Sequence, residues 1–235
     1  MPITPHDHLV KSYDDEMSRL TTEIAAMGEL SARQLEAAMD ALHERDGEVA
    51  QSVADNDDAI DEQERQISSD VLRLLALRQP MARDLRDVLA ALRIASDIER
   101  IGDHAENVAR RSIALNQSEP VPLASGLTAL ATAAAGMLRE VLRAYTARDA
   151  QAARAAWARD AELDALYTGL FRELLTYMME DPRSITACTH LLFIAKNLER
   201  IGDHATNIAE EVWFAVRGES LKEARTERKR RADEA

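Results

Sequence analysis

The chain has 235 residues, of which 46% are hydrophobic but only 4% aromatic, and its formal net charge is −13 at pH 7. This charge argues against a nucleic-acid-binding protein, which needs a basic face, and the longest weakly polar run, 127–138, is too short to span a bilayer. Because Cys188 is the only cysteine, no internal disulfide can form, and the first residues lack the basic-then-apolar pattern of a signal peptide. We therefore expect a cytoplasmic protein that binds cations or basic partner surfaces, binds no nucleic acid directly and reaches a membrane only through partners.

Apolar residues recur at three- and four-residue spacing along most of the chain, which predicts long helices. The dipeptides Arg45-Asp46 and Arg148-Asp149 interrupt this pattern, and Asp46 is a candidate N-cap. Gln79-Pro80 and Asp181-Pro182 mark turns, because a proline starts or ends a helix. The predicted helices cover approximately residues 5–45, 46–78, 81–115, 123–147, 149–180 and 182–218.

Residues 116–125 contain Pro and Ser, lie near the midpoint of the chain and form the best candidate for a linker. Three helices with short turns precede this segment and three follow it, and such groups bury one face of each helix. The expected fold class is therefore all-α, with two pseudo-symmetric antiparallel three-helix bundles at 1–117 and 118–218. A charged C-terminal tail is expected at 219–235.

One polar segment occurs twice in the chain. The seven residues Glu99–Ala105 reappear unchanged at Glu199–Ala205. Packing alone requires only apolar residues of suitable size, so the repeat indicates that both copies carry the same chemistry. Gly102 and Gly202 lie inside the predicted helices, where glycine costs about 1 kcal/mol relative to alanine. They indicate either close approach of another helix or a ligand, or a glycine that packing merely tolerates.

Acidic residues four positions apart share one face of a helix. Glu99 with Asp103, and Glu199 with Asp203, form such pairs, and none of the basic residues is expected to neutralise them along that line. The same spacing occurs on the preceding helices, which an antiparallel bundle brings alongside. These pairs are Asp57 with Asp61, and Asp160 with Asp164. Four carboxylates per repeat suit Mg²⁺, Ca²⁺, Mn²⁺ or iron rather than a structural zinc, whereas the alternative is a solvated acidic face.

The other polar residues of the repeat have structural interpretations. We expect Arg100 and Arg200 to pair with neighbouring helices, and His104 and its equivalent to form hydrogen bonds across the bundle. Cys188 is expected to be a small buried side chain. No histidine follows a glutamate at the spacing of di-iron bundle enzymes, and no nucleophile–base pair or glycine-rich phosphate loop is present. These features favour a protein that is not an enzyme.

Segments 72–109 and 180–210 resemble the two signatures of the PhoU family of phosphate-signalling proteins, and the resemblance covers nearly the whole chain. It implies two three-helix bundles and Glu/Asp-x-x-x-Asp motifs that bind divalent or trivalent metal ions or multinuclear clusters. Iron, zinc, manganese, magnesium and calcium all remain possible. By position the motifs are Glu99/Asp103 and Glu199/Asp203, with Asp57/Asp61 and Asp160/Asp164 as facing partners.

The resemblance also implies a regulatory function. PhoU-like proteins repress phosphate uptake and the phosphate-starvation response when phosphate is plentiful. They are expected to connect the ATPase subunit of the phosphate ABC transporter with the sensor histidine kinase of a two-component system, and to form homodimers. Two alternatives remain: a metal-dependent hydrolase or redox enzyme that uses the carboxylate clusters, and a structural helical-bundle interaction protein.

Overall fold

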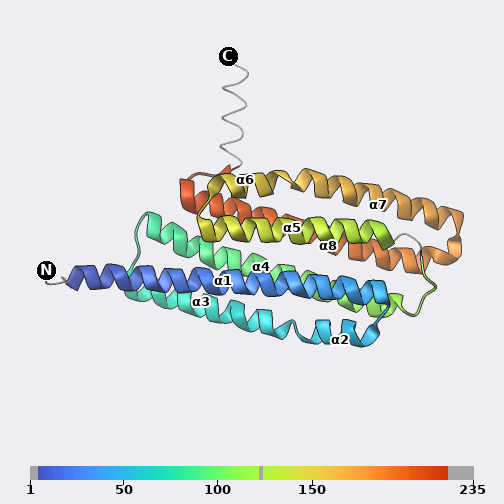
Figure 1. Ribbon diagram of the computed structural model, residues 1–235, viewed down its shortest axis with the longest axis horizontal. Coiled ribbons are helices and arrows are strands. Elements are labelled where there is room, and N and C mark those ends of the chain that lie inside the picture. Colours follow the sequence, from blue (N-terminus) through green and yellow to red (C-terminus); the bar gives the residue numbers. More distant parts are fainter. Residues whose placement is uncertain (1–4, 122–123, 222–235) are drawn as a thin grey trace, which may run out of the picture.

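A computed structural model describes residues 5–121 and 124–221, which contain helices and no strand. The helices pack along a common long axis as two groups, α1 to α4 and α5 to α8, with α4 against α8 between them (Figure 1). The turns that join α3 to α4 and α7 to α8 lie at opposite ends of the molecule, as expected for two antiparallel bundles related by pseudo-symmetry. None of the described helices combines the length and apolar character needed to cross a bilayer. The elements are α1 (Pro5–Glu44), α2 (Gly47–Asp55), α3 (Asp58–Arg78), α4 (Arg83–Leu115), α5 (Ala124–Ala147), α6 (Ala150–Ala158), α7 (Asp160–Glu180), the short 3₁₀ helix η1 (Pro182–Ser184) and α8 (Ile185–Arg217).

The predicted breaks after α1 and α5 occur where expected. Asp46 caps α2, since its carboxylate accepts hydrogen bonds from the backbone N–H groups of Glu48 and Val49 at 2.9 and 3.0 Å. Asp149 caps α6 in the same way. The residue before each cap adopts a positive φ, 57° at Arg45 and 51° at Arg148, which ends the preceding helix. The expectation that Asp46 is an N-cap is confirmed.

Two of the predicted helices are interrupted rather than continuous. The helix expected at 46–78 divides into α2 and α3, and the one at 149–180 divides into α6 and α7. At the first interruption the N–H groups of Ala59 and Ile60 bond three residues back instead of four, while Asn56 and Asp57 keep right-handed helical angles. The result is a tightened turn, which periodicity alone does not reveal because the apolar pattern continues through it.

A continuous apolar core runs through both groups of helices. Ile98 and Ile101 of α4, and Leu198 and Ile201 of α8, are fully buried. Buried alanines of both helices belong to the same core. Cys188 is also fully buried, which confirms its expected role as a small packed side chain.

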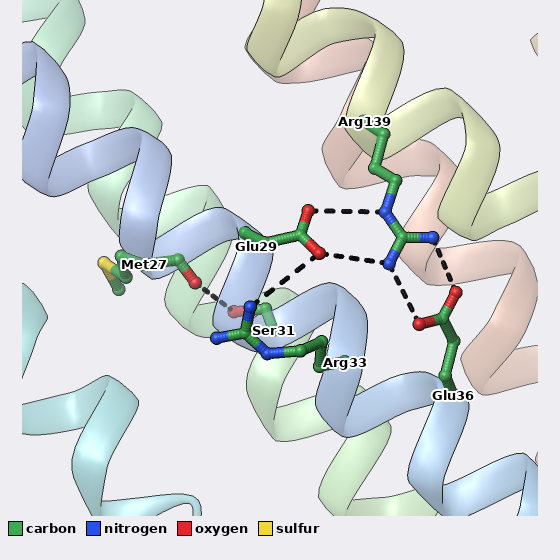
Figure 2. A network of polar contacts seen from close by, with 6 residues as sticks. All are labelled: Met27, Glu29, Ser31, Arg33, Glu36 and Arg139. Carbon is green, nitrogen blue, oxygen red and sulfur yellow. Dashed lines mark hydrogen bonds and ion pairs between the residues drawn. The ribbon is translucent and has the colours of Figure 1, made fainter.

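One polar contact between the groups joins positions that are equivalent in the two repeats. Figure 2 shows Arg139 of α5 bonded through its Nη2 atom to Glu36 Oε2 at 2.9 Å and to Glu29 Oε1 at 3.3 Å on α1. Glu36 and Arg139 each lie nine residues before the left-handed arginine that ends their helix. The two copies have therefore diverged into opposite charges that now pair with each other.

The two repeats have also diverged where α4 meets α8. Arg93 pairs with Glu211 at 2.9 Å. At the equivalent place with the repeats exchanged, the Arg111 guanidinium lies 4.4 Å from the ring centre of Phe193. An ion pair on one side thus corresponds to a cation–π contact on the other.

Candidate metal centre

Gly102 allows the start of α3 to lie directly against α4. A Cβ atom at this position would lie 3.0 Å from Asp57 Oδ1 and 3.0 Å from Ile60 Cδ1. Gly202 has the same function on α8, where an added Cβ would collide with the side chain of Leu163. Both glycines therefore serve close helix approach, and this approach brings the acidic start of one helix onto the repeated motif of the next.

The first cluster consists of Asp57, Asp61 and Asp103. Each offers one carboxylate oxygen, and the three oxygens lie within 4.8 Å of one another. Asp57 is only 9% exposed, and its Oδ1 accepts a hydrogen bond of 2.9 Å from the Gln34 side chain of α1. Burial raises the pKa of Asp57 to about 6 against the lowering effect of Gln34, and the carboxylates of Glu106, Asp103 and Asp61 raise it further.

Glu99 faces the same cluster from α4. Burial raises the pKa of its carboxyl group, and the charges of Asp103, Asp61 and Glu64 add to this rise while Arg100 opposes it. The four residues predicted for the first repeat therefore lie in one electrostatic environment. Carboxylate oxygens of the three aspartates lie close together, and Glu99 adds a further negative charge one helical turn before Asp103.

Arg100 differs from its prediction. Instead of pairing with a neighbouring helix, it contacts Asp103 at 2.8 Å and Glu99 at 3.3 Å on its own helix. A position three residues before Asp103 is adjacent to it on the helix surface, so the guanidinium reaches both carboxylates. The expectation that none of the basic residues neutralises this line of carboxylates was therefore wrong. The Arg100 side chain is 57% exposed, and such a pair contributes little to stability.

The second cluster contains Asp160, Asp164, Glu199 and Asp203, all predicted as ligands. Burial raises the pKa of Asp160, and the charges of Asp164, Asp203 and Glu199 raise it further, so the four lie near one another. Asp164 and Asp203 are exposed, and an open cleft of about 590 Å³ lies alongside. Within the described residues, only the first cluster brings three acidic oxygens within 4.8 Å.

A second correction concerns Lys196, which sequence reasoning missed. Its ammonium lies 2.5 Å from Glu199 Oε2, so the carboxylates of the second repeat also have a cationic partner on their own helix. Gln34 was missed as well, because it is far from Asp57 in sequence and belongs to no repeated pattern. Lys196 carried a usable signal, since it replaces Ser96 at the equivalent position beside an otherwise identical motif.

The two histidines of the motif face each other between α4 and α8. The His104 Nδ1 atom lies 3.0 Å from Asn197 Oδ1, and the His204 Nδ1 atom lies 2.8 Å from Asp97 Oδ1. The ring centres are 5.5 Å apart. This arrangement confirms that the histidines hydrogen-bond across the bundle.

The donor set of the first cluster fits a hard cation. Its ligand atoms are carboxylate oxygens, which suit Mg²⁺, Ca²⁺, Mn²⁺ or iron. The Asp57 side chain is buried beside two further carboxylates. Burial and the neighbouring carboxylates raise its pKa, so the ionised form is disfavoured at this place. A bound cation would compensate the negative charge of that form.

Comparison with known proteins shows strong similarity along the chain. The PhoU domain matches residues 24–112 and 127–212. A relative from Xylella fastidiosa (strain 9a5c), named phosphate-specific transport system accessory protein PhoU homolog, is 60% identical over 91% of this chain and 90% of its own length. A relative of the same name from Caulobacter vibrioides (strain NA1000 / CB15N) is 48% identical over 92% of this chain and 94% of its own.

Two crystal structures share the fold. That of PhoU from Pseudomonas aeruginosa is 39% identical, with a TM-score of 0.84, and the match covers 88% of this chain and 100% of the other. That of the phosphate transport system regulatory protein PhoU from Streptococcus pneumoniae is 30% identical, with a TM-score of 0.83 over 89% of this chain and 99% of the other. The family match and the shared fold therefore extend over both repeats.

Proposed function

The chain belongs to the PhoU family, and from this premise we propose that it is a negative regulator of phosphate uptake and of the phosphate-starvation response. Both relatives described above are named as accessory proteins of phosphate transport and not as enzymes. The chain accordingly has a regulatory role in phosphate transport and is not an enzyme. The hydrolase and redox alternatives are set aside on this ground.

In the proposed mechanism the protein is a cytoplasmic adaptor. It contacts the ATPase subunit of the phosphate ABC transporter and the sensor histidine kinase, and it acts as a homodimer. The net charge of −13 supports docking on basic protein surfaces. The observation that carries the proposal is the match of the family to both repeats, together with the identity of the acidic motif in each.

We further propose that a metal ion binds the first cluster and is part of the adaptor. Asp57, Asp61 and Asp103 would hold it, with Glu99 as the adjacent fourth carboxylate. The ion would supply positive charge where α3 meets α4 and would hold these helices together. A cation bound only by the folded protein adds stability of RT ln(1 + [L]/Kd).

The experiment is the activity of alkaline phosphatase in a strain that lacks the gene and grows in abundant phosphate. We expect high activity without the gene and low activity after its return. Normal repression in the deletion strain, with any paralogue also deleted, would contradict the proposal. Pull-down with the transporter ATPase and the sensor kinase tests the partners, and binding to neither at any phosphate level would contradict the adaptor role.

The role of the metal is tested in the same strain. A variant that carries Asp57→Asn and Asp103→Asn should fail to restore repression, whereas Asp58→Asn with Glu62→Gln should restore it. The control residues are exposed on the same helix as Asp61 but lie outside the cluster. Equal repression by both variants would instead favour a plain helical bundle with solvated acidic faces.

A further inference from the structure

The two carboxylate clusters occupy equivalent places in the two repeats, yet several surrounding positions differ, and three of these differences change how the carboxylates are held or neutralised. Alignment through the shared Arg-Asp breaks, the acidic pairs and the identical motif identifies these positions. They pair Gln34 with Met137, Glu64 with Tyr167, and Ser96 with Lys196.

Gln34 holds one carboxylate of the first cluster in place. The side chain is 8% exposed, and its Nε2 atom donates to Asp57 Oδ1 at 2.9 Å. The same Nε2 atom also donates to the Val53 carbonyl oxygen at 3.4 Å, while the buried Oε1 atom has no hydrogen-bond partner among the described residues. The donor end of the amide therefore faces Asp57. Met137, which is 2% exposed, cannot donate such a bond to Asp160. Partners that orient ligating carboxylates typically change metal affinity by about 10–100-fold.

Both repeats contain the motif arginine, Arg100 or Arg200, and Lys196 adds a further cation beside the second cluster. Its Nζ atom lies 2.5 Å from Glu199 Oε2 and 5.5 Å from the ring centre of Tyr167. The first repeat has Ser96 and Glu64 at these two positions, so a neutral hydroxyl and an additional carboxylate replace the ammonium and the ring that supports it. Both differences make the surroundings of the second cluster less negative than those of the first.

We propose that the two clusters are inequivalent: the first, positioned by Gln34, is the divalent-cation site, whereas Lys196 serves as the built-in counter-ion of the second. This inference rests on the metal-binding role proposed above and specifies which repeat performs it. A cation that enters the first cluster displaces the Arg100 guanidinium from Asp103, and one that enters the second displaces the Lys196 ammonium from Glu199. The second displacement costs more, because the Glu199 side chain is 13% exposed and that of Asp103 is 32% exposed. A cation in the second cluster also meets a more exposed carboxylate set, in which Asp164 and Asp203 face solvent.

The test is Mn²⁺ binding to the full-length protein, with free Mn²⁺ measured by electron paramagnetic resonance. We expect one tight and one weak site in the wild type. Asp103→Asn should remove the tight site and Asp203→Asn the weak one. Two sites of equal affinity in the wild type, or a tight site that is lost with Asp203→Asn, would overturn the inference.

Exchange of the divergent residues tests the cause. Lys196→Ser should tighten the weak site by at least tenfold, while Ser96→Lys and Gln34→Met should each weaken the tight site by about tenfold or more. Arg143→Ser removes a positive charge from exposed α5 surface and is expected to change neither site. Circular dichroism confirms that each variant is folded. Unchanged affinities in Lys196→Ser and Gln34→Met would overturn the inference.

Failure of the inference is distinguishable from failure of the proposed function. If none of the proteins binds Mn²⁺, Mg²⁺ or Fe²⁺, both the inference and the metal role fall, while the regulatory proposal is still decided by alkaline phosphatase activity. If both wild-type sites bind equally, only the inference falls.

Discussion

Substitution of Gly102 by alanine tests whether close approach of α3 and α4 forms the site. The added Cβ would lie 3.0 Å from both Asp57 Oδ1 and Ile60 Cδ1, and 3.3 Å from Ile60 Cγ2. Ile60 is 1% exposed and Asp57 is bonded to Gln34, so neither neighbour can move freely. Overpacking of this kind costs about 1–3 kcal/mol, and the better helix propensity of alanine returns about 1 kcal/mol. We expect a net loss of up to about 2 kcal/mol and weaker Mn²⁺ binding, because Asp57 is displaced.

The matched control is Gly169→Ala. Gly169 is an exposed glycine within α7, and an added Cβ there would have no neighbour within 4 Å. This variant should gain about 0.5–1 kcal/mol from reduced backbone entropy of the unfolded chain. Urea unfolding in the presence of a chelator, monitored by far-UV circular dichroism, measures the free energies of unfolding of both variants. An equal gain in Gly102→Ala and Gly169→Ala would refute the steric argument.

Three further predictions concern stability. Because burial raises the pKa of Asp57 from 3.8 to about 6, the unfolded chain ionises first, and this residue lowers stability as the pH rises through that range. In chelator at neutral pH, Asp57→Asn should therefore be more stable than wild type by about 1–3 kcal/mol, and this difference should vanish in acid. Urea unfolding across pH measures the difference in free energy of unfolding. A difference that does not change with pH would contradict the raised pKa of Asp57 as its cause. Arg139→Glu should destabilise the chain and Glu36→Arg should partly rescue it, with a coupling of about 1 kcal/mol in a double-mutant cycle; absence of coupling would mean that this pair does not link the repeats. Asp46→Ala and Asp149→Ala should each cost about 1 kcal/mol in thermal unfolding, and unchanged melting temperatures would show that the caps are dispensable.

The duplication has produced two halves that are no longer interchangeable. Glu36 now complements Arg139 at positions that began as copies of one another. Arg93 pairs with Glu211, whereas the exchanged positions hold Arg111 and Phe193. Charge reversal at one member of such a pair favours contact between unlike repeats over contact between like ones. The two carboxylate clusters have also diverged in charge, since Lys196 of the second repeat occupies the position of Ser96 in the first.

Local rules predicted much of the molecule. Apolar periodicity identified the helices, and Asp46 was predicted as a cap because its side-chain oxygen meets the free N–H groups of the next helix within a few residues. The exact repeat identified four of the acidic candidates, and the same four-residue spacing on the preceding helices identified the other four, since this spacing places carboxylates on one helix face. The tightened turn at Asn56 was not predicted, because it preserves helical angles and the apolar pattern.

The amino-acid sequence by itself determined the all-α class, the duplication and the acidic motifs, because these depend on interactions between residues a few positions apart. Only the tertiary structure decided which carboxylates converge, since Asp57 meets Asp103 across two helices held close by Gly102. The tertiary structure also decided which neighbouring side chains contact these carboxylates. Gln34 reaches Asp57 from a third helix, and Lys196, three residues before Glu199 in sequence, contacts its carboxylate in the folded chain. Convergence of this kind depends on how helices pack, and packing is a property of the whole chain.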